Sequence, residues 1–321
     1  MKKKTNSFLS FLAVLFLFFL LFSSPTKKLS KDTIHQQQFN AKYNIFSINK
    51  PESMDFCGEK VNLKSEDIWE RMDKELLKNI YWQSNSMLYL KRANKYFPII
   101  EPILKANNIP DDFKYLAVIE SGLENVVSPS KAAGFWQIME FTAKEYGLEV
   151  NKGIDERYNL EKATQVACEY LKNTYEKFGS WTMAAASYNK GKNGIRRLIE
   201  TQGTNNYYNL HLNNETSRYI FRVIAVKEIL ENPKKYGFIY REKDLYIFPK
   251  YKVVEVNSTI DDLSAFAKQH GTNYKLLKQF NPWLRTISLP DKSKRIYKLK
   301  IPTDNSLLVF DDFLTPATQQ Q

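Results

Sequence analysis

The fold of this chain is decided by Tyr115-Leu116-Ala117-Val118-Ile119-Glu120-Ser121-Gly122. The five apolar residues are typical of the last turns of a buried helix, and the run ends at a glutamate. A carboxyl group at the end of an apolar helix is partly desolvated, which raises its pKa above the free value of ~4.3. A pKa near ~6 would keep Glu120 protonated long enough to act as a general acid near neutral pH. The alternative is a structural glutamate that only binds a backbone amide or a lysine.

Outward from this stretch, the sequence from Glu66 to about Tyr236 has a helical pattern, because apolar residues recur three and four positions apart. The first such series is Ile68, Met72, Leu76 and Ile80. Asn159 is expected to open another helix and Gly179 to end it. These patterns predict a mainly α fold.

The pattern changes after Pro233. Residues 251–256 and 295–302 alternate like strands, and they flank two short helical segments, 261–270 and 273–280. Strand, helix, helix and strand in this order predict a second, small βααβ domain.

The N-terminus has the composition of an export signal. Lys2-Lys3-Lys4 precedes an apolar run from Phe8 to Phe22. At ~1.5 Å per residue this run covers roughly 22 Å, less than a ~30 Å hydrocarbon core, yet no clean cleavage site follows it. A cleaved signal peptide and a retained membrane tether through residues 8–22 both stay open. The polar residues that follow are expected to form an irregular linker.

The formal net charge of +12 indicates either an anionic partner or a solvated basic surface. Basic residues outside Lys2-Lys3-Lys4 are scattered, and an export signal takes the chain away from nucleic acid, so we expect no nucleic-acid partner. Cys57 and Cys168 are the only cysteines; in an oxidising compartment they either form a disulfide or stay two unrelated buried thiols. With His35, His211 and His270 they give no recognisable zinc-ligand spacing, so we expect no metal site.

Three further motifs follow Glu120. The first is a loop that runs into a helix, Ser128-Pro129-Ser130-Lys131-Ala132-Ala133-Gly134-Phe135-Trp136-Gln137-Ile138-Met139, where small residues let the backbone approach a ligand closely. The second is a small-residue helix that ends in Ala186-Ser187-Tyr188-Asn189-Lys190-Gly191. The third is Asn214-Glu215-Thr216-Ser217-Arg218-Tyr219, which opens another helix.

In this order and spacing, Glu-Ser, Gly-x-x-Gln, Ser-Tyr-Asn-x-Gly and Glu-Thr-x-x-Tyr resemble the soluble-lytic-transglycosylase catalytic domain, which is related to goose-type lysozyme. Phe135-Trp136-Gln137 looks closest to the membrane-bound lytic murein transglycosylase D branch of that family. The βααβ segment, with Asn281-Pro282 at its turn, resembles a LysM peptidoglycan-binding domain. The resemblance implies 62–240 as lysozyme-like catalytic domain and 248–303 as LysM-like domain. Composition and pattern predict residues 1–24 as signal peptide or anchor, 25–61 as linker and 304–321 as tail.

Carried over by residue, the resemblance implies that Glu120 is the sole catalytic acid and base. Gln137 and Tyr188 would bind substrate. The other implied substrate-binding positions are Ser121, Ser128, Met139, Asn189 and Glu215. For Met139 a plain core role stays open, Ser121 could be a simple helix-end hydroxyl, and Asn189 could mainly shape its turn.

The resemblance further implies cleavage of peptidoglycan glycan strands between N-acetylmuramic acid and N-acetylglucosamine. Glu120 would protonate the linking oxygen, and the substrate's N-acetyl group would assist the cationic centre. Glu120 would then deprotonate the C6 hydroxyl that attacks C1, leaving a 1,6-anhydromuramic end. Such internal attack benefits from an effective molarity of ~10⁵–10⁸ M. Neither metal nor diffusible cofactor is expected, and the periplasm or cell envelope is the expected location.

Two other functions stay open. A lysozyme-like hydrolase would need a second carboxylate, ~5–5.5 Å or ~6.5–9.5 Å from the first. The nominal candidates are Glu124, Glu140, Glu145, Asp155 and Glu215. A non-catalytic cell-wall-binding protein would instead rely on the βααβ domain. The sequence indicates no oligomeric state.

Overall fold

The computed structural model describes residues 29–42, 45–290, 295–304 and 307. The expected signal or anchor, residues 1–24, lies outside the described residues, as does most of the expected tail. Among the helices of the described ranges, none combines the length and apolar character needed to cross a membrane.

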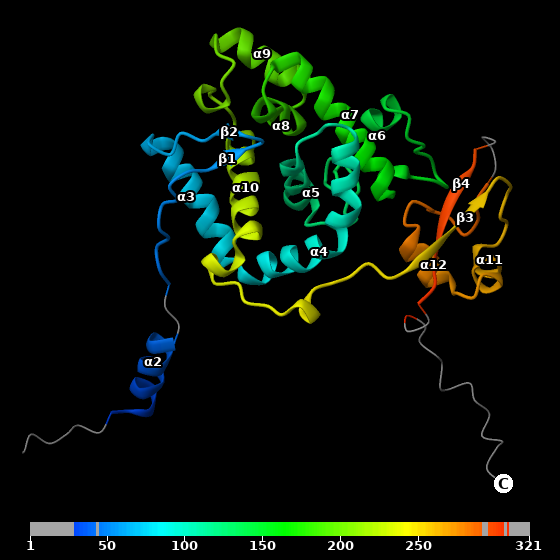
Figure 1. Cartoon of the computed structure of the whole chain (residues 1–321), viewed down its shortest axis with the longest axis horizontal. Coiled ribbons are helices and arrows are strands. Elements are labelled where there is room, and N and C mark those ends of the chain that lie inside the picture. The colour runs from blue at the N-terminus through cyan, green and yellow to red at the C-terminus, as the bar shows by residue number, and fades with distance from the viewer. Residues whose placement is uncertain (1–28, 43–44, 291–294, 305–306, 308–321) are drawn as a thin grey trace, which may run out of the picture. The chain divides into compact units, whose positions relative to one another are not determined.

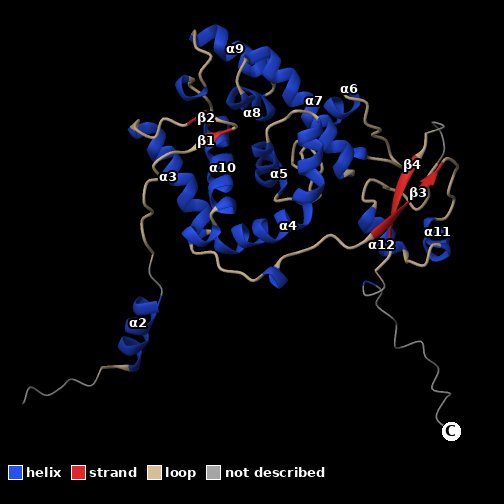
Figure 2. Cartoon of the chain, viewed as in Figure 1, coloured by secondary structure: helices blue, strands red, loops and turns tan. Residues whose placement is uncertain are grey.

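The helical part begins with helix α2 (Lys31–Lys42) and a two-stranded hairpin, β1 (Asp55–Phe56) and β2 (Glu59–Lys60). The helices that follow are α3 (Glu66–Tyr81), α4 (Gln83–Ala106), η1 (Asp111–Phe113), α5 (Lys114–Ser121), α6 (Glu140–Glu145), η2 (Glu156–Tyr158), α7 (Leu160–Phe178), α8 (Trp181–Lys190), α9 (Lys192–Gln202), η3 (Tyr207–Asn209), α10 (Asn214–Glu231), η4 (Pro233–Tyr236) and η5 (Glu242–Asp244). A βααβ module follows: β3 (Tyr251–Val256), α11 (Leu263–Gln269), α12 (Tyr274–Phe280) and β4 (Tyr297–Pro302). Figures 1 and 2 show this succession.

Helix α5 lies in the interior of the helical domain. All five residues from Tyr115 to Ile119 are buried, and α10 packs against α5 as well as against α3 and α8 (Figure 1). The apolar run therefore forms the buried helix that was predicted. Because the helix ends at Ser121, its last carboxyl group is brought to the edge of the core.

The predicted helix boundaries around α7 are confirmed. The side chain of Asn159 accepts a hydrogen bond from the backbone N–H of Lys162, as an N-cap residue does. Gly179 ends the helix with a φ of 71°, a left-handed conformation that favours glycine. The predicted apolar face of α3 is also buried: Ile68, Met72, Leu76 and Ile80.

The segment expected to be an irregular linker contains regular structure. Residues Lys31–Lys42 form helix α2, and β1 pairs with β2 in an antiparallel hairpin. Phe56 is fully buried against Phe113, with ring centroids 5.2 Å apart. The hairpin therefore belongs to the packed helical domain, because it contributes an aromatic side chain to its core.

The βααβ prediction is confirmed. Strands β3 and β4 pair antiparallel, with Tyr251 opposite Pro302 and Val256 opposite Tyr297. Asn281 is fully buried and fastens the end of α12 to β4. Its amide donates to the carbonyl of Lys300 at 2.7 Å, and its carbonyl accepts from the N–H of Lys300 at 2.8 Å. Helix α11 is shorter than predicted because Asp262 caps it through the N–H groups of Ser264 and Ala265.

The module and the helical domain share one hydrophobic cluster. Ala133, Ile154 and Tyr158 of the helical domain lie in the same cluster of buried residues as the module's core. Ile154 also forms a β-bridge with Leu284. Backbone hydrogen bonds reinforce the contact: the N–H of Asp155 donates to Trp283 at 2.9 Å, and the N–H of Arg285 donates to Gly153 at 2.8 Å. The module is therefore packed directly onto the segment before α7.

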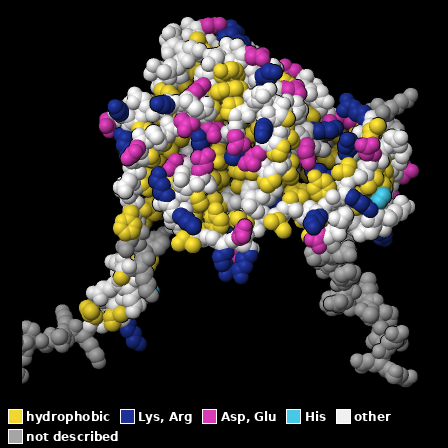
Figure 3. Space-filling view, viewed as in Figure 1, with side chains coloured by type: hydrophobic (Ala, Val, Ile, Leu, Met, Phe, Trp, Pro, Cys, Tyr) yellow, Lys and Arg dark blue, Asp and Glu magenta, His cyan; other side chains and the backbone are white. Residues whose placement is uncertain are grey.

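The surface carries its charge in a dispersed form. On the face in Figure 3, Lys and Arg side chains lie among Asp and Glu side chains rather than in one basic patch. This face agrees with a solvated basic surface and offers no concentrated footprint for a polyanion.

Candidate functional site

Glu120 is the penultimate residue of α5. Gly122 caps the helix at φ 64°, and its N–H donates to the carbonyl of Val118 at 2.8 Å. The next residue, Leu123, is again buried, so the chain folds back on the core directly after the turn. The Glu120 side chain is consequently part-buried at the end of a buried helix.

The carboxylate of Glu120 accepts a hydrogen bond from the hydroxyl of Tyr219, on the first turns of α10. Burial raises the pKa of Glu120 to about 7; the Tyr219 hydrogen bond and the positive charge of Arg222 act in the opposite direction, and the charge of Glu215 raises it slightly. Arg222 itself donates to the carbonyl of Ile119 at 3.0 Å. Glu120 is therefore a carboxyl group that is substantially protonated at neutral pH.

Tyr188 lies near Glu120, at the end of α8. Its hydroxyl donates to the carbonyl of Trp136 at 2.7 Å. The pKa of Tyr188 is raised well above its usual value, first by burial and then by the charge of Glu120. Trp136 is fully buried, and its indole N–H donates to Thr164 Oγ1 at 2.8 Å. Tyr188 is thus a neutral phenol that connects the Glu120 environment to the loop before α6.

Asn189 and Glu215 join the end of α8 to the start of α10. The amide of Asn189 donates to Glu215 Oε1 at 3.1 Å, and its carbonyl accepts from Thr216 Oγ1 at 2.7 Å. Glu215 is exposed. The structure therefore brings Glu120, Tyr188, Asn189 and Glu215 together, and Asn189 acts through side-chain hydrogen bonds.

Ser128 and Gln137 shape the loop that precedes α6. Gln137 has a φ of 46°, and its amide donates to the carbonyls of Val126 at 3.0 Å and Gly134 at 2.8 Å. The hydroxyl of Ser128 accepts from the N–H of Ala132 at 3.0 Å. Both predicted substrate-binding side chains thus have structural partners within the loop.

Gly134 was expected to let the backbone approach a ligand, and the structure gives it a different role. A Cβ atom at this position would lie 2.0 Å from the carbonyl oxygen of Arg157, and the φ of Gly134 is +80°. The close approach is therefore between two segments of the protein.

Arg157 holds both sides of the same loop. Its guanidinium makes a two-pronged ion pair with Asp155, at 2.9 Å and 2.7 Å. It also donates to the carbonyls of Lys131 at 2.9 Å and Ile138 at 3.2 Å. Because Arg157 and Asp155 are both buried, this pair fixes the loop against the segment that carries the βααβ module.

Ser121 and Met139 have local environments. The Ser121 hydroxyl donates to the carbonyl of Ala117 at 3.0 Å, which is the helix-end role left open by its sequence. Met139 is part-buried and precedes the first residue of α6.

Two residues of the Glu120 environment were missed as site residues. Tyr219 belongs to the Glu-Thr-x-x-Tyr motif, and it lies four positions after Glu215, hence on the same helix face. Arg222 follows three positions later on that face. The motif was therefore a usable signal for Tyr219, whereas Arg222 had none.

The possible disulfide is absent, because Cys57 and Cys168 are both free thiols. Cys57 lies in the turn of the hairpin with a φ of 54°, and its N–H donates to Asp112 Oδ2 at 2.6 Å. Cys168 is buried inside α7. Burial raises the pKa of Cys57 and takes that of Cys168 to about 12, so both stay protonated. In the part of the chain that the structure describes, no group of three or more His, Cys, Asp and Glu side chains could hold a metal ion.

Comparisons with known proteins identify both parts of the chain. Residues 97–211 match the transglycosylase SLT domain, and residues 252–305 match the soluble lytic transglycosylase C-terminal LysM-like domain. The first match includes Glu120, Gln137 and Tyr188 and ends before Tyr219.

Over 191 residues the chain is 28% identical to membrane-bound lytic murein transglycosylase D of Escherichia coli strain K12. The matched stretch covers 57% of this chain and 41% of that protein. The protein of the same name from E. coli O6:H1 gives the same values. A protein of Alteromonas sp. strain M-1, named for tributyltin chloride resistance, is 25% identical over 130 residues, 40% of this chain and 63% of that one. The matched stretch thus spans less than half the length of the E. coli relatives.

Proposed function

We propose that this chain, which carries a transglycosylase SLT domain followed by a LysM-like domain, is a lytic transglycosylase that cleaves the glycan strands of peptidoglycan. The observation that carries the proposal is the state of Glu120. Its carboxyl group is part-buried at the end of α5, is held by the Tyr219 hydroxyl, and has its pKa raised to about 7. A general acid with a pKa near the working pH combines a protonated population with a strong tendency to give up its proton.

In the proposed reaction, protonated Glu120 donates its proton to the oxygen between N-acetylmuramic acid and N-acetylglucosamine. The C1–O bond breaks, and the N-acetyl group of the muramic residue stabilises the cationic C1. The Glu120 carboxylate then takes the proton of the C6 hydroxyl while that oxygen bonds to C1. The glutamate ends protonated, and the glycan ends in a 1,6-anhydro ring without water being consumed.

The surrounding residues have roles that follow from their contacts. Tyr219 orients the carboxyl group and stabilises its ionised form, which is the base of the second step. The charge of Arg222 favours the same form. Tyr188, as a neutral phenol that already donates to Trp136, offers its oxygen lone pairs to a substrate hydroxyl or amide. Ser128 and Gln137 would keep the loop in shape while their remaining polar atoms meet the sugars.

Of the five carboxylates that a hydrolase could use, Glu145 is exposed at the end of α6 and the other four have partners. Asp155 is paired with Arg157, Glu124 with Arg92 and Glu140 with Lys144. Glu215 is the candidate whose charge acts on Glu120, and its carboxylate accepts from Asn189. We propose that Glu215 supports the site and that the internal C6 hydroxyl replaces the attacking water. The periplasm or cell envelope is the proposed location, because peptidoglycan lies there.

Product analysis tests this function. Purified sacculi are digested with the wild-type chain and with Glu120→Gln, and the released muropeptides are weighed by mass spectrometry. We expect anhydro ends from the wild type and a loss of release by at least about 10²-fold in the variant. Glu200→Gln, the same change of charge on an exposed ion pair within α9, should release as much as wild type.

Reducing ends, heavier by one water, would show a hydrolase instead. Equal release by the wild type and Glu120→Gln would rule out this glutamate as the acid. Binding of sacculi without any release would leave only a wall-binding protein.

A further inference from the structure

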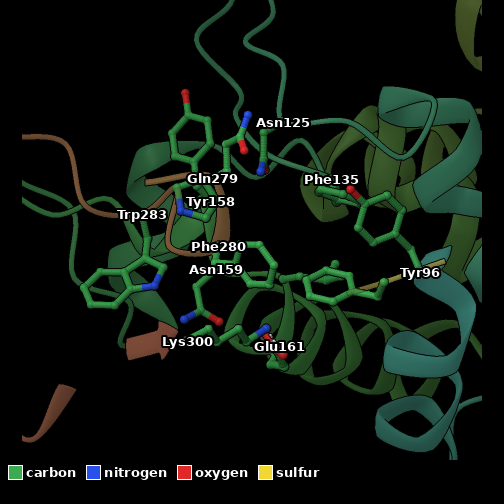
Figure 4. Close-up of a pocket in the computed structure, with 13 residues that line it drawn as sticks. Tyr96, Asn125, Phe135, Tyr158, Asn159, Glu161, Gln279, Phe280, Trp283 and Lys300 are labelled. Atoms are coloured by element: carbon green, nitrogen blue, oxygen red, sulfur yellow. Dashed lines mark hydrogen bonds and ion pairs between the residues drawn. The ribbon is translucent and has the colours of Figure 1, made fainter. Parts of the chain in front are cut away.

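A pocket lies at the junction of the SLT domain and the LysM-like domain (Figure 4). Tyr96 and Phe135 stand at one end of the pocket, and Trp283 and Asn159 stand at the other. Its lining comes from both domains: Tyr96, Asn125, Phe135, Tyr158, Asn159, Leu160 and Glu161 on one side, and Phe248, Gln279, Phe280, Pro282, Trp283 and Lys300 on the other. The pocket therefore exists only when the two domains are packed together.

The size of the pocket suits a small chemical group. Its volume is about 60 Å³, whereas one water needs at least ~10–15 Å³, so a group of a few heavy atoms fits. A larger groove of about 320 Å³ shares four lining residues with it: Asn159, Glu161, Trp283 and Lys300. A ligand whose ring lay in the groove could place one substituent in the pocket.

The pocket has apolar walls and unused hydrogen-bond donors. Trp283 is only 3% exposed, yet its indole N–H makes no hydrogen bond with any residue that the structure describes, and its nitrogen is turned towards Asn159 (Figure 4). This nitrogen is not among the unpaired atoms that are sealed inside the protein. The carbonyl of Asn159 caps α7, which leaves its amide N–H₂ free. Two donors from opposite domains thus converge on one small cavity.

The charges beside the pocket argue against an ionic ligand. Lys300 forms an ion pair with Glu161, and the same ammonium lies 5.5 Å from the Phe248 ring. A carboxylate or phosphate would have to compete with Glu161 for this cation. A neutral acceptor that carries a methyl group satisfies the N–H donors and contacts the aromatic walls.

We propose that this junction pocket binds the acetamido group of an N-acetylated sugar, with the Trp283 indole and the Asn159 amide donating to its carbonyl and the aromatic rings contacting its methyl group. The identity of the polymer rests on the proposed function, since peptidoglycan strands carry an acetamido group on every sugar. Asn125 and Phe135 belong to the same segment as Gln137, whose amide donates to Val126. The same loop carries Trp136, whose carbonyl accepts from Tyr188 of the Glu120 environment, so one loop connects the pocket to that environment.

The test follows the Trp283 indole directly. The chain is prepared as Glu120→Gln with ¹⁵N-tryptophan, and its five tryptophans give separate indole N–H signals, that of Trp283 being assigned by its loss in Trp283→Phe. The probes are the N-acetylglucosamine tetramer and the glucosamine tetramer that lacks the acetyl groups. We expect a saturable shift of the Trp283 signal with the first probe and none with the second.

Asn159→Asp tests the second donor without disturbing the helix. Aspartate keeps the capping oxygen and removes the amide donor, so the dissociation constant reported by Trp283 should rise between about twofold and tenfold, the effect of one hydrogen bond. Asn206→Asp is the matched control, because Asn206 also caps a helix and lies outside the pocket. It should leave the dissociation constant unchanged.

A Trp283 signal that stays in place with the acetylated tetramer would overturn the proposal. Equal shifts with both probes, or equal weakening by Asn206→Asp, would overturn it as well. Because the Glu120→Gln chain does not cleave, these results do not depend on the reaction. A chain that binds through Trp283 but releases no anhydro ends would refute the proposed activity and leave the pocket proposal standing. A chain that releases anhydro ends while its Trp283 signal stays in place would refute the pocket proposal and leave the activity standing.

Discussion

The hydroxyl of Tyr219 donates a hydrogen bond to the carboxylate of Glu120, a residue 99 positions earlier in the chain. The contact joins the start of α10 to the end of α5, two helices that pack against each other in the core. Burial and this hydrogen bond act on the pKa of Glu120 in opposite directions, so the acid's strength depends on both.

Tyr219→Phe tests this balance. The hydrogen bond lowers the pKa of Glu120, so its removal should raise that pKa above about 7. The acid must be protonated, and activity falls as pH rises through its pKa; this alkaline limb should therefore move to higher pH in the variant. The rate at the optimum should also fall, by about 10- to 100-fold, because the carboxyl group loses its orienting donor. Tyr208→Phe is the control, because it removes a buried hydroxyl that has no hydrogen-bond partner among the described residues. An unchanged pH profile of muropeptide release would contradict the role of Tyr219.

Glu120 should also reduce the stability of the fold at neutral and alkaline pH. Its pKa in the folded protein, about 7, lies above the ordinary 4.5, so the folded state holds the proton more tightly. Below pH 4.5 both states are protonated and no penalty exists; as pH rises from 4.5 to 7, stability is lost. Glu120→Gln removes the penalty, so at pH 8 it should be more stable than wild type by roughly 1–2 kcal/mol, a figure reduced for the exposed part of the side chain.

Urea unfolding at pH 4 and pH 8 measures this difference. The advantage of the variant should be confined to the higher pH. An advantage of the same size at both values would mean that ionisation is not its cause.

Much of the fold was predictable because it depends on local patterns. The apolar run at residues 115–119 predicted a buried helix, and Asn159 and Gly179 predicted both ends of α7. The position of Glu120 at the end of that helix predicted a desolvated carboxyl group, and burial does raise its pKa to about 7. Its catalytic role came from the resemblance and stays a prediction. The resemblance supplied Tyr188, Asn189 and Glu215, which the structure brings near it.

The features that could not be predicted from the sequence depend on contacts between segments that are far apart in the chain. Nothing near Cys57 in the sequence reveals that its backbone N–H is bound to Asp112. Of the two alternatives that the sequence left open for the cysteines, the structure has two free thiols. The role of Gly134 could not be predicted, since the carbonyl of Arg157 that it faces is 23 positions away.

Two glycine substitutions separate this packing from backbone strain. Gly134→Ala places a methyl group on the Arg157 carbonyl and strains a positive φ, so it should destabilise the fold by about 3–5 kcal/mol. Gly147→Ala has a similar φ of +83° with no atom within 4 Å, and it should cost only about 1–2 kcal/mol. Chemical denaturation measures both. Equal losses would show that the close approach contributes nothing.

Arg157→Lys tests the ion pair that holds the loop. Lysine keeps the charge but cannot make the two-pronged contact with Asp155 together with the bonds to Lys131 and Ile138. We expect a loss of about 1–3 kcal/mol in unfolding free energy and faster amide exchange in residues 131–138. Arg196→Lys, on an exposed pair within α9, should change neither. Normal protection of the loop in Arg157→Lys would refute this role.

The shared cluster of Ala133, Ile154 and Tyr158 with the LysM-like core bears on where the proposed cleavage would occur along a glycan strand. A wall-binding domain joined by a flexible linker would let the active site reach many glycosidic bonds around the place where that domain is bound. In this structure the LysM-like module is packed against the helical domain, so a glycan held by the module would lie at a defined position relative to Glu120. Under the proposed function, we therefore expect cleavage at a fixed distance from the glycan segment that the LysM-like domain binds.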